Sequence, residues 1–234
     1  NIREKFNVAI LLITHDVGVA YAVSDRVIVL NKGKIVEEGK AQKILLQPCH
    51  PYTKDLVSAR QLLSTQVRKE CCFADCLLKV NGLCKCFSKA KAGQQILREL
   101  SFVLNKGEIL GVLGQSGCGK STLAKCLTGL TIPEKGEVLY HNQDISKLQG
   151  KKRLWVCGKM QIIMQDARAS LNPRRPALEL VKEPLNYLHL GTAAEREEKA
   201  QYYLQLVGIT KELQNKRAPQ LSTGQCQRVA IARA

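Results

Sequence analysis

Two apolar runs stand out in the pattern of hydrophobic and polar positions. "FNVAILLIT" at residues 6–14 is a continuous apolar run rich in β-branched residues, which predicts a strand buried on both faces. A short helix through Ala20 to Val23 is expected to follow it. "EILGVLG" at 108–114 predicts a second apolar strand, followed by a glycine-rich loop and a helix. The pattern therefore predicts an α/β fold.

Between these two apolar runs, the spacing of apolar residues is first that of strands and then that of helices. "RVIVLNKGKIVEEG" alternates around Asn-Lys-Gly, which predicts a hairpin with Gly33 at the position of positive φ. "AQKILLQP" and "YTKDLVSAR" have helical spacing. Residues 60–76 show no clear period and are predicted to be a linker. The chain therefore has two parts, 1–59 and 77–234, on either side of this linker.

The second part begins with strands and ends with helices. Gly107 and Gly136 are expected to be turns between its strands, which are "LLKVNGLCKCF", "QQILRELSFVLNKGE" and "GEVLYHN". After about Ser170 the spacing becomes helical. Thr192 and Glu195 have the spacing of a capping box, and Gly208 stands where a helix is expected to stop. These features predict an antiparallel β subdomain followed by an α-helical subdomain.

The glycine-rich loop at 114–121 fits the pattern G-x-x-x-x-G-K-[ST] of a P-loop. Its glycines allow successive backbone N–H groups to surround phosphate oxygens, and the following helix adds the positive end of its dipole. A lysine at this position reaches the β- and γ-phosphates, and the serine after it ligates Mg²⁺. The preceding strand and following helix supply the required context. The predicted nucleotide-binding residues here are Gly114, Gln115, Ser116, Gly117, Cys118, Gly119, Lys120, Ser121 and Thr122.

The composition bears on four further questions: nucleic-acid binding, membrane spans, the cell compartment and a zinc site. The 234 residues carry a formal net charge of +16, but the basic residues are scattered and aromatic residues make up only 5%, so no specific nucleic-acid partner is expected. No apolar run approaches the 18 or more residues that a membrane span needs. Ten cysteines without a visible signal peptide indicate a reducing compartment. The spacing of the Cys71–Cys86 cluster matches no standard zinc pattern, and its role stays open.

Several further stretches resemble one family, the ATP-binding cassette (ABC) ATPases. "LSTGQCQRVAIARA" at 221–234 looks like the family's signature segment, and "IIMQD" at 162–166 resembles its Q-loop. "LLITHD" at 11–16 resembles the strand that ends in the switch histidine. "SLNPR" at 170–174 and "HPYT" at 50–53 resemble the branch that imports peptides and nickel. The resemblance covers nearly all of the chain outside residues 60–76.

The resemblance implies a role for each matching residue. His15 would contact the γ-phosphate and help to position the attacking water, and Gln165 would contact Mg²⁺ or that water. Phe87 would stack on adenine. Ser222, Gly224 and Gln225 would cap the γ-phosphate of ATP bound to a second cassette, because two cassettes of this family sandwich each nucleotide. The catalytic candidates are therefore His15 and Gln165, and the Mg²⁺ ligands are Ser121 and Gln165.

Two departures from the family pattern concern the signature segment. Thr223 replaces the first of its two usual glycines, which adds a β-carbon near the partner nucleotide and is expected to weaken the sandwich. Cys226 stands where Arg or Lys is common.

The order of the motifs also departs from the family. The switch histidine normally comes last, yet here it precedes the P-loop, and no Walker B strand with its Asp and catalytic Glu is found. The chain therefore resembles the tail of one cassette, at 1–59, followed by the head of a second, at 77–234. Its start without methionine also fits a fragment. Because the switch strand lies next to the P-loop strand in such folds, the two parts are expected to pair as a permuted domain.

These observations support one leading hypothesis and two alternatives. The leading hypothesis is an ABC-type ATP-binding subunit that uses MgATP, a second cassette and membrane permease subunits to import peptides, nickel or similar small solutes. Such a subunit is expected to be cytoplasmic and peripheral on the inner face of the cell membrane. The alternatives are a soluble ABC protein that acts on nucleic acid or ribosomes, and a hydrolysis-deficient cassette fragment. Without the Walker B groups, hydrolysis is expected to be impaired.

Overall fold

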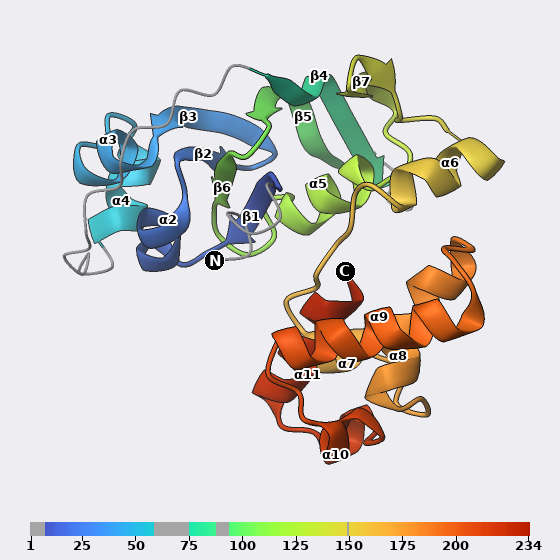
Figure 1. Cartoon of the computed structure of the whole chain (residues 1–234). Coiled ribbons are helices and arrows are strands. Elements are labelled where there is room, and N and C mark those ends of the chain that lie inside the picture. The colour runs from blue at the N-terminus through green and yellow to red at the C-terminus, as the bar shows by residue number, and fades with distance from the viewer. Residues whose placement is uncertain (1–7, 59–74, 88–93, 149) are drawn as a thin grey trace. The chain divides into compact units, whose positions relative to one another are not determined.

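The computed structural model describes residues 8–58, 75–87, 94–148 and 150–234. The chain divides into two compact units, Asn1–Gln149 and Gly150–Ala234. Unit 1 contains two β-sheets with their helices, and unit 2 is helical (Figure 1).

The first sheet of unit 1 joins the two predicted parts of the chain. Strands β1 (Ile10–Thr14), β6 (Ile109–Leu113), β2 (Arg26–Asn31) and β3 (Lys34–Lys40) occur in the order β1-β6-β2-β3. β6 pairs in parallel with β1 from Ile10↔Ile109 to Thr14↔Leu113, and in parallel with β2 on its other side. The expected pairing of the switch strand with the P-loop strand is therefore confirmed.

Three helices pack on this sheet through one apolar cluster. They are α2 (Val17–Val23), α3 (Ala41–Leu46) and α4 (Pro51–Ser58). Leu113, at the end of β6, is fully buried in this cluster together with residues of α2, α3 and β2. The β2–β3 hairpin is confirmed, with Gly33 at φ +78°. The cluster fixes the strand end from which the glycine-rich loop emerges.

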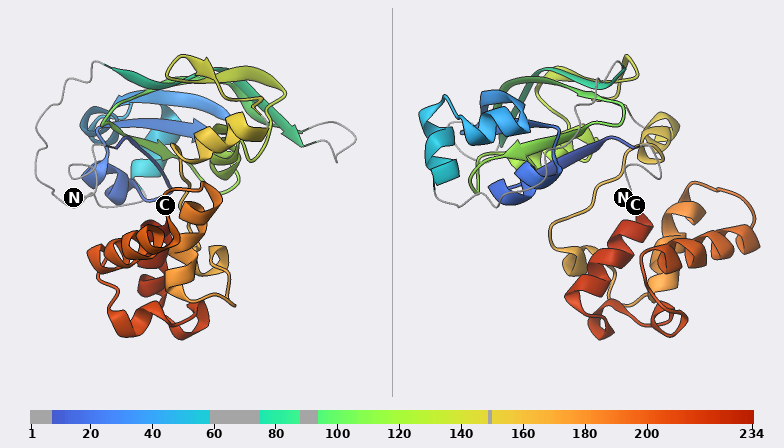
Figure 2. Two further views of the ribbon diagram at one scale, coloured as in Figure 1. Left: turned by 45° about the vertical axis from the view of Figure 1, so that its right-hand side comes forward. Right: turned by 60° about the vertical axis from the view of Figure 1, so that its left-hand side comes forward.

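The second sheet is antiparallel, as predicted. Its order is β5-β4-β7-β8, formed by β4 (Cys76–Phe87), β5 (Gln94–Asn105), β7 (Lys135–Tyr140) and β8 (Gln143–Asp144). Figure 2 shows the two sheets one over the other, and β3 contacts β5. Helix α5 (Lys120–Leu127) contacts β1 of one sheet and β5 of the other. The helix that begins at the glycine-rich loop is therefore held by both sheets.

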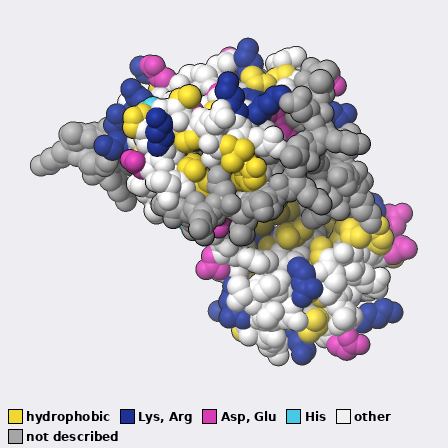
Figure 3. Space-filling view, turned by 90° about the vertical axis from the view of Figure 1, so that its left-hand side faces the viewer, with side chains coloured by type: hydrophobic (Ala, Val, Ile, Leu, Met, Phe, Trp, Pro, Cys, Tyr) yellow, Lys and Arg dark blue, Asp and Glu magenta, His cyan; other side chains and the backbone are white. Residues whose placement is uncertain are grey.

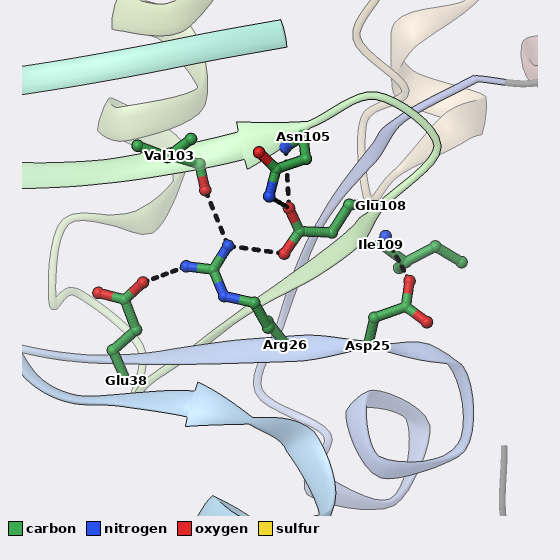
Figure 4. A network of polar contacts seen from close by, with 7 residues as sticks. All are labelled: Asp25, Arg26, Glu38, Val103, Asn105, Glu108 and Ile109. Carbon is green, nitrogen blue, oxygen red and sulfur yellow. Dashed lines mark hydrogen bonds and ion pairs between the residues drawn. The ribbon is translucent and has the colours of Figure 1, made fainter. Parts of the chain in front are cut away.

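A polar network ties β2 and β3 to the segment that enters β6 (Figure 4). Arg26 donates to the fully buried carboxylate of Glu108 at 2.7 Å and also pairs with Glu38. The other oxygen of Glu108 accepts from the backbone and side-chain amides of Asn105, both at 2.8 Å. Asp25 accepts the Ile109 N–H at 2.8 Å. The buried charge is thus compensated, and removing one partner of such a pair costs about 3–5 kcal/mol.

Unit 2 is built from seven short helices of the described chain. They are α6 (Gly150–Cys157), α7 (Ala167–Ser170), α8 (Ala177–Tyr187), α9 (Ala193–Leu206), α10 (Lys211–Gln214), the 3₁₀ helix η1 (Ala218–Gln220) and α11 (Thr223–Arg233). Leu180, Leu204 and Val229 are fully buried at the centre of its core. The capping box of Thr192 and Glu195 is present at the start of α9. Gly208 has a φ of +75° two residues after this helix ends, as predicted.

Four local predictions differ from the structure. The residues of β1 are only partly buried, because β1 forms an edge of the sheet among the described residues. Gly136 lies inside β7 and not in a turn, and a β-carbon there would lie 2.4 Å from the carbonyl oxygen of Gly82 on β4. Helix α2 begins at Val17, earlier than expected, because Asp16 caps it. Residues 60–74 of the predicted linker lie outside the described residues, and Cys76, the predicted end of the linker, instead begins β4.

Candidate nucleotide-binding site

The glycine-rich loop connects the buried strand β6 to helix α5. Gly117 and Gly119 have φ values of +81° and +101°, in the left-handed region that glycine adopts without strain. A β-carbon on Gly119 would lie 2.9 Å from the carbonyl oxygen of Ile96 on β5. Glycine at this position therefore meets both a conformational and a steric requirement.

The start of α5 is arranged to receive an anion. Gly119 is the N-cap and provides no side-chain cap, while the first N–H groups of any helix lack intrahelical acceptors. Lys120 Nζ donates to the carbonyl oxygens of Gly114 and Gln115 at 2.8 and 2.9 Å. Ser121 is exposed, so its hydroxyl can reach a bound cation. Backbone donors, an ammonium group and a hydroxyl thus surround the loop, which is a suitable environment for phosphate and Mg²⁺.

Cys118 is the least expected member of this loop. Its side chain is buried, and its sulfur lies 3.9 Å from Lys120 Nζ. Burial raises the pKa of the Cys118 thiol although the lysine charge opposes the shift. The thiol is therefore kept neutral and contributes to packing at the base of the loop.

The N-terminal segment contacts the loop at two backbone positions. The Gln115 N–H donates to the hydroxyl of Tyr52 in α4 at 3.0 Å. The Gly33 N–H, in the β2–β3 turn, donates to the carbonyl oxygen of Cys118 at 3.1 Å. Neither contact is evident from the sequence. "HPYT" and the hairpin glycine were visible in the sequence, but nothing in their spacing relates them to a loop more than 60 residues away.

The structure brings His15 to the same sheet edge as the glycine-rich loop. His15 follows Thr14, which pairs with Leu113, and Gly114 follows Leu113. The carboxyl ends of two neighbouring parallel strands therefore carry the histidine and the loop, the usual place for a ligand in such sheets. His15 is exposed, whereas Asp16 caps α2 by accepting from Gly18 N at 2.9 Å.

Phe87 ends β4, and its backbone pairs with Gln94 of β5. Its side chain lies outside the described part of the structure, so adenine stacking stays a prediction. Cys71 and Cys72 also lie outside the described residues, while Cys84 is buried and Cys76 exposed. Among the described residues, no group of three or more metal-ligating side chains comes together.

Unit 2 contains Gln165 and the predicted signature residues. Gln165 is exposed in an irregular segment just before α7. Ser222 is the N-cap of α11, its hydroxyl accepts from Gln225 N at 3.2 Å, and the Gln225 side chain accepts from Ser222 N at 2.8 Å. Gly224 is exposed, and nothing lies within 4 Å of where its β-carbon would be.

Two arginines connect the segment after Gln165 to the signature helix. Arg168 in α7 donates to the carbonyl oxygen of Leu221, directly before Ser222. Arg233, at the other end of α11, donates to the carbonyl oxygen of Ser170 at 3.0 Å. Within unit 2, the segments that hold Gln165 and the signature residues are therefore joined. No local pattern predicts these contacts, because an arginine in a helix has no preferred distant acceptor.

Comparison with protein families identifies the fold that these features form. Residues 97–234 match the family model described as ABC transporter. The chain belongs to this family. Its P-loop NTPase fold is the ABC cassette fold, with the mixed sheet and antiparallel sheet described above.

The chain is also similar to individual ATP-binding proteins of bacteria. It is 32% identical over 242 residues to an uncharacterized ABC transporter ATP-binding protein, YejF, of Escherichia coli K12, covering 100% of this chain and 45% of YejF. It is 29% identical over 264 residues to the glutathione import ATP-binding protein GsiA of Salmonella typhimurium LT2, covering 100% of this chain and 42% of GsiA. The chain thus spans less than half the length of these two relatives.

Solved cassettes share part of the fold. A dimeric post-hydrolysis structure of the ATP-binding cassette MJ0796, bound to ADP and Pi, has a TM-score of 0.62 and 29% identity, over 67% of this chain and 68% of that one. CbiO1 of Clostridium perfringens, part of the ABC transporter complex cbiONQ, has a TM-score of 0.57 and 28% identity, over 68% of this chain and 61% of its own.

Proposed function

We propose that this chain is part of an ATP-binding subunit that energises the import of peptides, nickel or similar small solutes. The arrangement of Lys120 and the N-terminus of α5 around the glycine-rich loop carries the proposal. Support for the solute class comes from similarity to GsiA, named for glutathione import, and to the nickel import protein NikE of Escherichia coli UTI89, 38% identical over 63% of this chain and 55% of NikE.

In this proposal each of the candidate residues has a distinct role in binding nucleotide. The backbone N–H groups of the loop hold the β-phosphate, and Lys120 leaves the carbonyl oxygens of Gly114 and Gln115 to pair with phosphate oxygens. Ser121 and Gln165 hold Mg²⁺, which neutralises phosphate charge when bound. His15 orients the attacking water at the sheet edge, and Phe87 stacks on adenine. Ser222, Gly224 and Gln225 face the nucleotide of a second cassette.

We also propose that the chain is the junction of two tandem cassettes, with its first part, 1–59, and its second part, 77–234, separated by the linker 60–76. The alignments with YejF and GsiA each cover the whole chain, which supports this order of segments in longer proteins. The in-register pairing of β1 with β6 supports a composite site across the junction. Since the sequence contains no Walker B segment, the chain alone is expected to bind nucleotide better than it hydrolyses it.

The proposed partners are a second cassette and permease subunits at the inner face of the cell membrane. Exposed Ile163 and Met164, directly before Gln165, provide apolar surface for contact with a permease. No helix in the described residues has the length and apolar character needed to cross a membrane. Figure 3 shows Lys and Arg side chains in several separate places on one face, which gives no support to a nucleic-acid stripe on that face.

Nucleotide titration tests the proposal. The wild-type chain is expected to bind a fluorescent ATP analogue saturably in the presence of Mg²⁺. Lys120→Met removes the charge that pairs with phosphate, so we expect affinity to fall about 10- to 100-fold. Lys125→Met is the matched control, because Lys125 is exposed on the same helix and the variant has the same net charge. Equal affinity of the two variants contradicts the proposed site.

Two further assays test the rest of the proposal. Turnover by the chain alone should be several orders of magnitude below that of complete cassettes, because the general base and the Mg²⁺-organising aspartate are missing. Turnover comparable to complete cassettes contradicts the expected impairment. Uptake of labelled dipeptide, glutathione and nickel by cells that express the complete system distinguishes the solutes, and salt-dependent binding of RNA would instead favour the alternative function.

A further inference from the structure

We propose that Tyr52 is a positioning residue for the phosphate-binding loop. Its hydroxyl oxygen accepts the Gln115 N–H at 3.0 Å, although the two residues are 63 positions apart in the chain. Gln115 is the second residue of the loop, directly after Gly114. Tyr52 fixes the direction in which the loop leaves the sheet, and it contacts the loop from outside.

The Gln115 backbone is held on both sides. Its N–H donates to Tyr52, and its carbonyl oxygen accepts from Lys120 Nζ at 2.9 Å and from Cys118 N at 3.4 Å. The orientation of this residue therefore influences the position of the lysine ammonium group. At the other side of the loop, the carbonyl oxygen of Cys118 accepts from Gly33 N at 3.1 Å. The N-terminal segment thus holds the loop at two backbone positions.

Tyr52 is itself fixed by its surroundings. Its ring is partly buried against the apolar cluster that contains Leu113, and its backbone N–H donates to Nδ1 of His50 at 3.2 Å. The Glu37 carboxylate accepts from the backbone of Cys49 at 2.8 Å and of His50 at 3.2 Å, which fixes the turn before α4. Burial opposes ionisation of Glu37, but polar interactions with the Thr53 side chain and with the backbone of Cys49 and His50 together hold its pKa below the ordinary value.

The expected consequence is a better ordered loop before nucleotide arrives. Gln115 is exposed, so without the hydroxyl its N–H would bond to water and the loop would sample more conformations. Nucleotide binding would then require ordering of the loop, at a cost in affinity. A single neutral hydrogen bond contributes modestly, so we expect a loss of about 3- to 10-fold. The loss should extend to both ATP and ADP, because the backbone N–H groups of the loop are proposed to hold the β-phosphate that both share.

Tyr52→Phe tests the proposal, with Tyr21→Phe as the matched control. Tyr21 is also partly buried against the same apolar cluster, so both variants keep an aromatic ring there and lose one hydroxyl. Hydrogen exchange of the Gln115 amide is measured at native pH without nucleotide, and dissociation constants are measured for ATP and ADP. We expect Tyr52→Phe to speed exchange at Gln115 several-fold and to weaken both nucleotides, whereas Tyr21→Phe changes neither.

The two readouts separate this inference from the proposed function on which its affinity arm rests. Unchanged exchange at Gln115 in folded Tyr52→Phe, or exchange equally fast in Tyr21→Phe, overturns the positioning role whether or not nucleotide binds. Nucleotide affinity equal in both variants, or a loss confined to ATP, also overturns it. Faster Gln115 exchange in Tyr52→Phe together with no nucleotide binding by the wild-type chain means that the proposed function fails while the Tyr52 contact holds.

Discussion

Helices α5 and α11 both begin at predicted phosphate contacts, but they begin in opposite ways. The N-cap of α5 is Gly119 at φ +101°, without a side-chain cap. The N-cap of α11 is Ser222 at φ −67°, in a reciprocal capping box with Gln225. The positive end of the helix dipole is present in both. The difference is that no side chain caps the first backbone N–H groups of α5, whereas the Ser222 hydroxyl accepts a hydrogen bond from one of those of α11.

The start of α5 therefore depends on contacts with other elements, whereas the start of α11 is stabilised by its own residues. The loop before α5 is held by hydrogen bonds with Gly33 and Tyr52 of other elements, and the first donors of the helix remain available to an anion. In α11 the hydroxyl of Ser222 and the N–H of Gln225 are already bonded to each other. A partner nucleotide would therefore meet Gly224 N–H, which has no intrahelical acceptor at this position. Three substitutions test this contrast.

Gly119→Ala is expected to have the largest effect, because it disturbs both the φ value and the contact with Ile96. We expect the free energy of unfolding to fall by about 2–3 kcal/mol and nucleotide affinity to fall with it. Urea denaturation measures the first and nucleotide titration the second. Gly117→Ala is the control, since Gly117 also has positive φ but has nothing within 4 Å of the added carbon. Equal losses in the two variants would show that the contact with Ile96 does not matter.

Ser222→Ala should have an intermediate effect, confined to the helical unit. Loss of the cap is expected to lower the free energy of unfolding by about 1 kcal/mol. Nucleotide affinity of the chain alone should stay unchanged, because Ser222 is predicted to face the ATP of a second cassette. Ser222→Asp is the control, since a carboxylate also caps a helix N-terminus. Weaker nucleotide binding by the isolated Ser222→Ala chain would contradict this division of roles.

Gly224→Ala should have the smallest effect on folding, and with the opposite sign. Gly224 lies in the first turn of α11 with open space beside it, so alanine is expected to stabilise the helix by about 0.5 kcal/mol. ATP-dependent pairing of cassettes should weaken, because the methyl group occupies the approach of the partner nucleotide. Thermal denaturation and analytical ultracentrifugation with ATP measure the two effects. If ATP-dependent pairing of cassettes becomes stronger in Gly224→Ala as the helix becomes more stable, Gly224 does not make the predicted contact with the partner nucleotide.

The sequence predicted the local features of the fold well. The period of the apolar residues identified β6 and the β2–β3 hairpin, and the spacing of Thr192 and Glu195 identified the cap of α9. The spacing of Ser222 and Gln225 carries the same capping-box signal. Because these features depend on residues a few positions apart, the local sequence contains the necessary information.

The burial of each strand and the contacts between distant segments could not be predicted from the sequence in the same way. β1 and β6 are both apolar five-residue strands, yet β6 is buried throughout while β1 is only partly buried. Apolar character favours burial, but the number of neighbouring strands decides how much of it a strand obtains. The contacts of Tyr52 with Gln115 and of Arg168 with Leu221 likewise depend on which elements meet.

Short patterns in the sequence specify the candidate functional residues of this protein: a loop with the residues to hold phosphate, a histidine after an apolar strand, and a signature segment at the start of a helix. These depend on short spacings, which the backbone geometry of one loop or one helix turn fixes. The pairing of β1 with β6 and the contacts of Tyr52 and Gly33 with the loop arise instead from tertiary packing. Packing brings distant segments together only when the whole unit buries its apolar surface, so no local pattern specifies such contacts in advance.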